Sequence, residues 1–124
     1  FGAGAQLLER SGTPAGYVLS HPWRLGDVPA LNSLLGSLPA DADTLYIHDL
    51  AILPQARGTG AASVLVARLI ALAVKENLPT MSLVAVNGSA PFWSRQGFSV
   101  ETRPQLLNKL ASYGDGAAWM LRRL

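Results

Sequence analysis

The sequence predicts one α/β or α+β domain of 124 residues built around a mixed β-sheet. Three apolar stretches carry this prediction: a strand-length run at residues 44–53, a longer run at 61–76, and another strand-length run at 81–86. A strand, a helix and a strand in this order normally form a parallel pair joined by a right-handed crossover. Shorter apolar runs, separated by glycine and proline, add a hairpin before this unit and strands after it.

The first elements are a hairpin and a long connection. Residues 5–10 and 15–21 are short apolar-rich runs that flank the turn-forming sequence Ser11-Gly12-Thr13-Pro14, so we expect two antiparallel strands there. Residues 22–43 then mix tryptophan, glycine and proline with leucines, and residues 28–35 predict a turn or two of helix. A connection of this length in a small domain is often functional.

The central helix is predicted at residues 61–76, which are almost entirely Ala, Leu, Val and Ile. Because Arg68 and Lys75 are its main charges, most of its circumference should be buried. Asn77 suits the left-handed position after a helix, and Pro79 prevents continuation. Beyond the strand at 81–86, we expect a short helix at 89–96, a strand at 98–102, a short helix at 104–113 and a last strand at 117–122.

Composition excludes several classes of protein. With 49% hydrophobic and 15% charged residues, the chain is neither a disordered tail nor a coiled coil. No cysteine is present, which excludes disulfide scaffolds, thiolate metal sites and cysteine nucleophiles, and fits a cytoplasmic location. With two histidines and a net charge of +2, we expect no metal site and no nucleic-acid footprint. No apolar run reaches the roughly 20 residues of a membrane span.

The stretch that carries chemistry is a glycine turn between a predicted strand and the central helix. Gly58 and Gly60 let the backbone bend so that successive N–H groups converge on phosphate oxygens at a helix N-terminus. A Walker loop needs Lys and Ser/Thr where Ala61-Ala62 stands, and a dinucleotide fingerprint needs a third Gly or Ala where Ser63 stands. A third pattern, Gln or Arg, two residues, Gly, one residue, Gly, is matched from Gln55 onward.

With this motif the sequence resembles the GCN5-related N-acetyltransferase superfamily. A second family segment follows at the right distance, after the next predicted strand: Asn87-Gly88-Ser89-Ala90-Pro91-Phe92-Trp93-Ser94-Arg95-Gln96-Gly97-Phe98. The resemblance implies a mixed, mostly antiparallel sheet with a central splayed parallel strand pair and flanking helices. The family begins with a strand and two helices that have no counterpart here, so residues 1–124 are expected to form a single, N-terminally truncated domain.

The resemblance also implies acetyl-CoA as the cofactor and an amine as the acceptor. In the family the glycine turn binds the pyrophosphate, the preceding strand pairs with the pantetheine arm, and the second segment flanks the arm. Carried onto this sequence, these positions are Arg57, Gly58, Thr59, Gly60, Ala61 and Ala62 for phosphate, Leu50, Ala51 and Ile52 for pantetheine, and Asn87, Ser89, Phe92 and Trp93 for the far side.

Acetyl transfer to an amine requires removal of a proton. An amine with a pKa near 10.4 is the free base so seldom at pH 7 that deprotonation costs roughly 4.6 kcal/mol. We expect His48 to act as the base, because an ordinary imidazole titrates near pH 6.5. Strand alternation predicts that its side chain shares a face with those of Tyr46, Leu50 and Ile52. The side chain of Asp49 is then expected on the opposite face. The sequence Tyr46-Ile47-His48-Asp49-Leu50-Ala51 also resembles a strand of serotonin N-acetyltransferase relatives, in which histidines conduct the amine proton away. His48 matches one histidine and Tyr46 replaces the other.

The general acid departs from the family pattern. Trp93 stands where the family usually has a tyrosine, and an indole N–H cannot supply a proton at physiological pH. Tyr113, Tyr46 or water would substitute, or the thiolate would leave unassisted.

The sequence gives only a few candidate residues for the acceptor site. Trp23 and Tyr46 are candidates for lining it, and Asp27, Asp41 and Asp43 form a mildly acidic rim that would attract a cationic amine. His21, beside Pro22 at a strand end, is expected at the surface.

The predicted activity is N-acetyl transfer to a small-molecule or peptide primary amine by direct attack in a ternary complex. Two other functions stay open. The chain could be a non-catalytic acyl-CoA-binding module, in which Trp93 and the missing front have removed the chemistry. It could also be an interaction domain that self-associates through its exposed sheet, as a homodimer.

Overall fold

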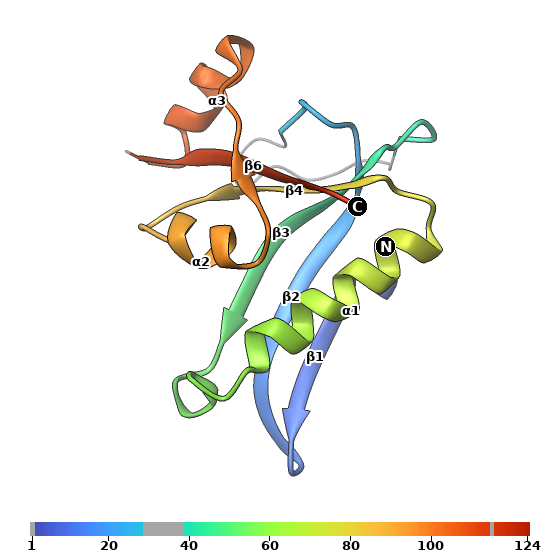
Figure 1. The fold of residues 1–124 in the computed structure, drawn as a ribbon, viewed down its shortest axis with the longest axis vertical. Coiled ribbons are helices and arrows are strands. Elements are labelled where there is room, and N and C mark those ends of the chain that lie inside the picture. Colours follow the sequence, from blue (N-terminus) through green and yellow to red (C-terminus); the bar gives the residue numbers. More distant parts are fainter. Residues whose placement is uncertain (1, 29–38, 115) are drawn as a thin grey trace.

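The computed structural model describes residues 2–28, 39–114 and 116–124. In this part of the chain one six-stranded sheet has the order β1-β2-β3-β4-β6-β5 (Figure 1). The strands are β1 (Ala5–Arg10), β2 (Thr13–Trp23), β3 (Thr44–Ile52), β4 (Thr80–Ala85), β5 (Ser99–Val100) and β6 (Ala118–Arg123). The α-helices are α1 (Ala61–Lys75), α2 (Ala90–Arg95) and α3 (Leu107–Ala111), and single turns of 3₁₀-helix occupy Gly2–Gly4, Pro54–Ala56 and Pro104–Leu106.

The sheet is mixed, as predicted. β3 and β4 are parallel, whereas the other described pairs are antiparallel. The parallel pairing is short and runs from Thr44 opposite Thr80 to Ile47 opposite Leu83. β3 therefore continues for five residues, His48 to Ile52, without β4 beside it.

Most predicted elements are confirmed, with shifts at their ends. β2 extends through Pro22 to Trp23 instead of ending at His21, because Pro22 and Trp23 still pair with β3. The strand predicted at 98–102 is reduced to Ser99–Val100, and the helix predicted at 104–113 divides into a 3₁₀ turn and α3. The helix predicted at 28–35 lies outside the described residues, apart from Val28.

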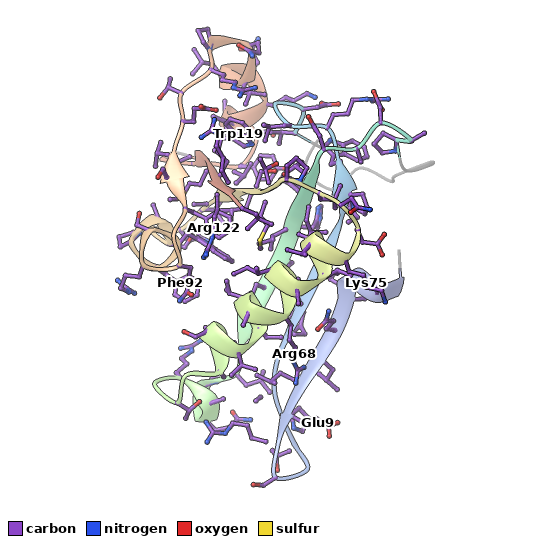
Figure 2. The ribbon with its side chains drawn as sticks, turned by 45° about the vertical axis from the view of Figure 1, so that its right-hand side comes forward. Glu9, Arg68, Lys75, Phe92, Trp119 and Arg122 are labelled. Carbon is purple, nitrogen blue, oxygen red and sulfur yellow. The ribbon has the colours of Figure 1, made fainter. Side chains whose placement is uncertain are left out.

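Two apolar clusters pack the helices and loops against the sheet. On one face, α1 packs Leu65 and Leu69, which are fully buried, against Leu45 and Ile47 of β3. The second cluster contains Val28, Leu106, Trp119 and Leu121, with Leu110 and Tyr113 from the region of α3 packed on it. The predicted burial of α1 is confirmed on this inner side, while Arg68 and Lys75 are exposed (Figure 2).

The face opposite the α1 cluster is uncovered along β1 and the first part of β2 in the described structure. Leu7 of β1 and its β2 partner Tyr17 are 57% and 37% exposed, and Leu19 is 44% exposed. Of the described helices, none is long and apolar enough to cross a lipid bilayer.

Candidate functional site

A β-bulge at His48 is the origin of the site. Leu19 of β2 opposes Asp49 of β3, but the next residue, Ser20, opposes Ile47, so His48 is an extra residue without a partner. A bulge of this kind bends the strand and interrupts its hydrogen-bond ladder. The bulge follows directly after Ile47, the last residue that pairs with β4, and the two parallel strands separate there.

The bulge overturns the predicted distribution of side chains on β3. Opposed residues of antiparallel strands share a face, and β2 runs from Leu19 to His21 without an insertion, so Asp49 and Tyr46 point to the same side. Leu50 and Ile52 instead pack on the α1 cluster. The prediction that these two accompany His48 and Tyr46, with Asp49 opposite, is wrong. One inserted residue resets the two-residue period.

A cavity of about 470 Å³ lies where β3 and β4 separate. Its size is within the range usual for small-molecule sites. Eight of the predicted cofactor residues line it, namely Leu50, Ala51, Ile52, Arg57, Asn87, Ser89, Phe92 and Trp93. His48 and Asp49 line the same cavity, so the bulge and the predicted cofactor positions share one space.

A second cavity of about 370 Å³ adjoins the first at Ile52, Arg57 and Phe92, which line both. The glycine turn lines it through Gly58, Gly60, Ala61 and Ala62, and Arg95 of α2 adds a positive charge. Phe92, on α2, is labelled in Figure 2. The two cavities together extend from the bulge to the N-terminus of α1.

The glycine turn presents unused backbone donors to this space. Within the described residues, no backbone hydrogen bond is donated by the amides of Gly58, Gly60 and the first turn of α1 at residues 61–63. Gly58 and Gly60 have φ of 78° and 83°, and a Cβ at either would meet nothing within 4 Å. They are therefore required by conformation and not by packing, and the space above them is open to a ligand.

Two members of the predicted phosphate cradle are arranged differently. The amides of Arg57 and Thr59 donate to the carbonyls of Pro54 and Ala56, both at 3.3 Å. Thr59 lines a separate hollow beside Arg10, whose guanidinium donates to the Thr59 carbonyl at 3.2 Å. The bond from Arg10 joins the turn to the β1–β2 hairpin, and the amides on either side of Thr59 stay free.

His21 is buried, which corrects the predicted surface position. Its side chain is 7% exposed because β2 continues past it, and its ring centroid lies 5.5 Å from that of Tyr46 and 6.2 Å from that of His48. Nδ1 lies 3.1 Å from the Pro22 carbonyl and donates to it, whereas buried Nε2 has no partner in the described structure. Burial lowers the pKa of His21, an effect that the Pro22 carbonyl opposes and the charge of His48 reinforces.

Tyr46 and Trp23 do not line either cavity. Tyr46 is 2% exposed, and burial, followed by the charge and hydrogen bond of Tyr113, raises its pKa well above the ordinary value. Its hydroxyl therefore stays protonated at physiological pH. Trp93 is also largely buried, between the rings of Phe92 and Phe98 at 5.0 and 5.3 Å.

The three aspartates of the predicted acidic rim already have partners within the protein. Asp27 forms a salt bridge with Lys109 at 3.0 Å, and Asp41 forms one with Arg24 at 2.9 Å. Asp43 accepts the backbone amide of Leu25 at 2.7 Å. These bonds join residues 24–27 to residues 41–43 and to α3.

One feature of the site was missed from the sequence. The hydroxyl of Tyr17 donates to the Oδ2 atom of Asp49 at 2.7 Å, from a strand 32 residues earlier. The pair depends on the register of β2 against β3 and on the bulge. No local pattern encodes either one.

Comparison with known proteins gives one family. The model described as the Acetyltransferase (GNAT) family matches residues 2–98, which is most of the chain. No curated protein matches the sequence.

Solved structures share the fold at low sequence identity. N-acetylglutamate synthase from Neisseria gonorrhoeae, complexed with coenzyme A and N-acetyl-glutamate, has a TM-score of 0.70 at 21% identity. The match covers 98% of this chain and 26% of that one, so this chain spans about a quarter of its length. Arabidopsis thaliana Naa50, in complex with a bisubstrate analogue, has a TM-score of 0.67 at 14% identity, and the match covers 98% of this chain and 74% of that one. Tetrahymena GCN5 has a TM-score of 0.66 at 17% identity, and the match covers 96% of this chain and 66% of that one.

Proposed function

The chain belongs to the GNAT acetyltransferase family, and on that premise we propose that it transfers an acetyl group from acetyl-CoA to a primary amine. The transfer takes place by direct attack within a ternary complex. The observation that carries the proposal is the pair of adjoining cavities, which runs from the bulge at His48 to the free amides of the glycine turn. The Neisseria gonorrhoeae enzyme of similar fold is complexed with coenzyme A, which supports the choice of cofactor.

The residues present fit acetyl-CoA at both ends. The amides of Gly58, Gly60 and residues 61–63 are free donors at the N-terminus of a long helix, where anionic groups bind well. Each charge-assisted hydrogen bond contributes about 1.5 to 3 kcal/mol, more than the helix dipole at roughly 0.3 to 1 kcal/mol. Beyond Ile47, no strand of the described structure pairs with the β4 side of β3, so the backbone there is available to an extended amide-containing arm.

Bound acetyl-CoA would supply an acetyl group activated as a thioester. His48 would accept the proton of the acceptor ammonium, because its ring is exposed, lines the larger cavity and stands on the strand that borders it. Tyr46 is unsuited to that task, since its hydroxyl is buried and holds its own proton. Tyr46 instead supports the ring of His48 from 6.3 Å, centroid to centroid.

No acid is assigned to the departing thiol. Trp93 lines the larger cavity, but an indole N–H only donates a hydrogen bond. A thiol has a pKa of about 8.5, so its thiolate is a tolerable leaving group near neutral pH. We propose that Trp93 serves as a wall of the arm's channel.

Two measurements on the unmodified chain test the proposal. Calorimetric titration with acetyl-CoA should show saturable binding at one site, and primary amines should then cause release of free thiol. Binding without thiol release from any amine would favour the non-catalytic module. Absence of binding would overturn the proposal and leave a self-associating domain, which sedimentation would reveal.

A further inference from the structure

We propose that Asp49 binds a second positive charge on the acceptor, so that the preferred acceptor is a short diamine and not a monoamine. This inference rests on the proposed acetyltransferase function, and it names the substrate class of the same site. It depends on where the bulge directs the side chain of Asp49, on what holds the carboxylate there, and on the lack of a cation to neutralise it.

The bulge places a base and a carboxylate side by side. In a regular strand, consecutive side chains point to opposite faces. Asp49 opposes Leu19, on the face that also carries Tyr46 and His21, and the ring of the inserted His48 lies within 6.3 Å of both those rings. His48 and Asp49 therefore turn toward one side of the sheet, and both line the larger cavity.

Tyr17 holds the carboxylate in position. Its hydroxyl donates to Oδ2 at 2.7 Å, and this bond, with the negative charge of Asp49, raises the pKa of Tyr17 so that it remains a donor. Oδ1 has no hydrogen-bond partner within the described residues, and the residue is exposed. One oxygen is thus fixed, and the other is available to a ligand.

Asp49 differs in its charge balance from Asp27 and Asp41, whereas Asp43 likewise forms no ion pair within the described residues. Asp27 and Asp41 are each neutralised by a basic side chain, Lys109 and Arg24. No lysine or arginine in the described parts of the chain forms an ion pair with Asp49. An ammonium group on the acceptor would complete this pair.

The spacing selects a short acceptor. His48 and Asp49 are consecutive residues of β3, and both line the larger cavity. Consecutive strand residues are about 3.3 Å apart along the strand. Two nitrogen atoms separated by only a few methylene groups can therefore reach both side chains. Leu19, opposite Asp49 and 44% exposed, offers an apolar surface to the methylene groups between them.

Matched acceptors and matched variants test the inference. Wild-type enzyme should acetylate 1,4-diaminobutane with a lower KM than butylamine, which has the same carbon chain and one charge fewer. Asp49→Asn keeps an oxygen acceptor for Tyr17 and removes the charge. It should raise the KM for the diamine about five- to tenfold and leave the KM for butylamine unchanged. Asp41→Asn, which removes a carboxylate already paired with Arg24, should change neither value.

The outcomes separate this inference from the proposed function. The Kd of acetyl-CoA should be equal in wild type and Asp49→Asn, so a wild type that does not bind acetyl-CoA would overturn the function itself. Equal KM values for the two amines in the wild type would overturn the role of Asp49. So would a diamine preference that survives in Asp49→Asn, or acetylation of neither amine by a chain that binds acetyl-CoA.

Discussion

The two halves of β3 have opposite surroundings although they form one strand. Residues 44–47 pair with β2 on one side and β4 on the other, and their side chains are at most 4% exposed. Residues 49–52 pair with β2 and with no other strand of the described structure, and residues 48–52 are all exposed or half-buried. One inserted residue, His48, separates the halves.

The difference shows how one strand serves both stability and binding. The closed half places Leu45 and Ile47 in the α1 cluster, where burial of apolar area stabilises the fold. The open half gives up pairing with β4 and gains a cavity. Substitutions in the closed half should therefore alter unfolding, and substitutions around the open half should alter binding and rate.

The largest expected effect is on stability in the closed half. Leu45 is fully buried, so Leu45→Ala removes apolar contacts and leaves a cavity, which should lower the free energy of unfolding by about 2 to 5 kcal/mol. Leu50→Ala, in the open half and partly buried, is the matched control and should lose about 1 kcal/mol. Urea denaturation measures both. Equal losses would mean that the two halves do not differ as described.

The next effect is on rate in the open half. His48→Gln should lower kcat by roughly 10²- to 10³-fold, because the base that takes the amine proton is lost. The Kd of acetyl-CoA and the urea midpoint should stay close to wild type, since His48 is exposed. Steady-state kinetics with calorimetry checks both statements. A kcat within threefold of wild type would remove His48 from the proton transfer.

A smaller effect concerns the glycine turn. Gly58→Val should weaken acetyl-CoA binding about tenfold, because a branched side chain would fill the space over the free amides. Gly116→Val is a matched control, since Gly116 has φ of 77° against 78° for Gly58, and a Cβ there also meets nothing. Both variants should lose about 1 to 3 kcal/mol of stability through backbone strain. If both lost affinity equally, strain alone would explain the result.

The smallest effect is the pH dependence of stability. The buried position of His21 lowers its pKa, so between that value and the unfolded value near 6.5 the unfolded chain binds more protons. Stability is then complete above about pH 6.5 and falls as the pH drops below it, by at most about 1.4 kcal/mol per pH unit. His21→Gln should flatten this part of the curve in urea denaturation at pH 7.5, 6.5 and 5.5. Parallel curves for variant and wild type would contradict it.

The predictable parts of the molecule are those that the sequence encodes locally. The helix predicted at 61–76 is observed as α1 (Ala61–Lys75), and it follows from a mostly apolar run that Ser63 and Arg68 interrupt. Asn77 follows the helix with φ of 58°, as its left-handed preference indicates. Gly58 and Gly60 belong to a turn whose function depends on neighbouring amides. Such features need no knowledge of distant strands.

The features that escaped prediction depend on pairing between distant strands. Nothing in residues 44–53 indicates which one is inserted, so alternation assigned Asp49 to the wrong face. The burial of His21 follows from the continuation of β2 beyond Pro22, which pairs with Leu45 despite lacking an N–H. The hydrogen bond between Tyr17 and Asp49 depends on the register of β2 against β3 and on the bulge at His48.

The most direct test of the account is an amide ¹H–¹⁵N correlation spectrum recorded during titration with coenzyme A. Because the free amides should bind the diphosphate, the signals of Gly58, Gly60 and residues 61–63 should shift most, together with those of residues 48–52. The amides of residues 44–47, in the closed half, should barely move. Saturable shifts confined to other parts of the chain would contradict the claim that the space beyond the bulge holds the cofactor.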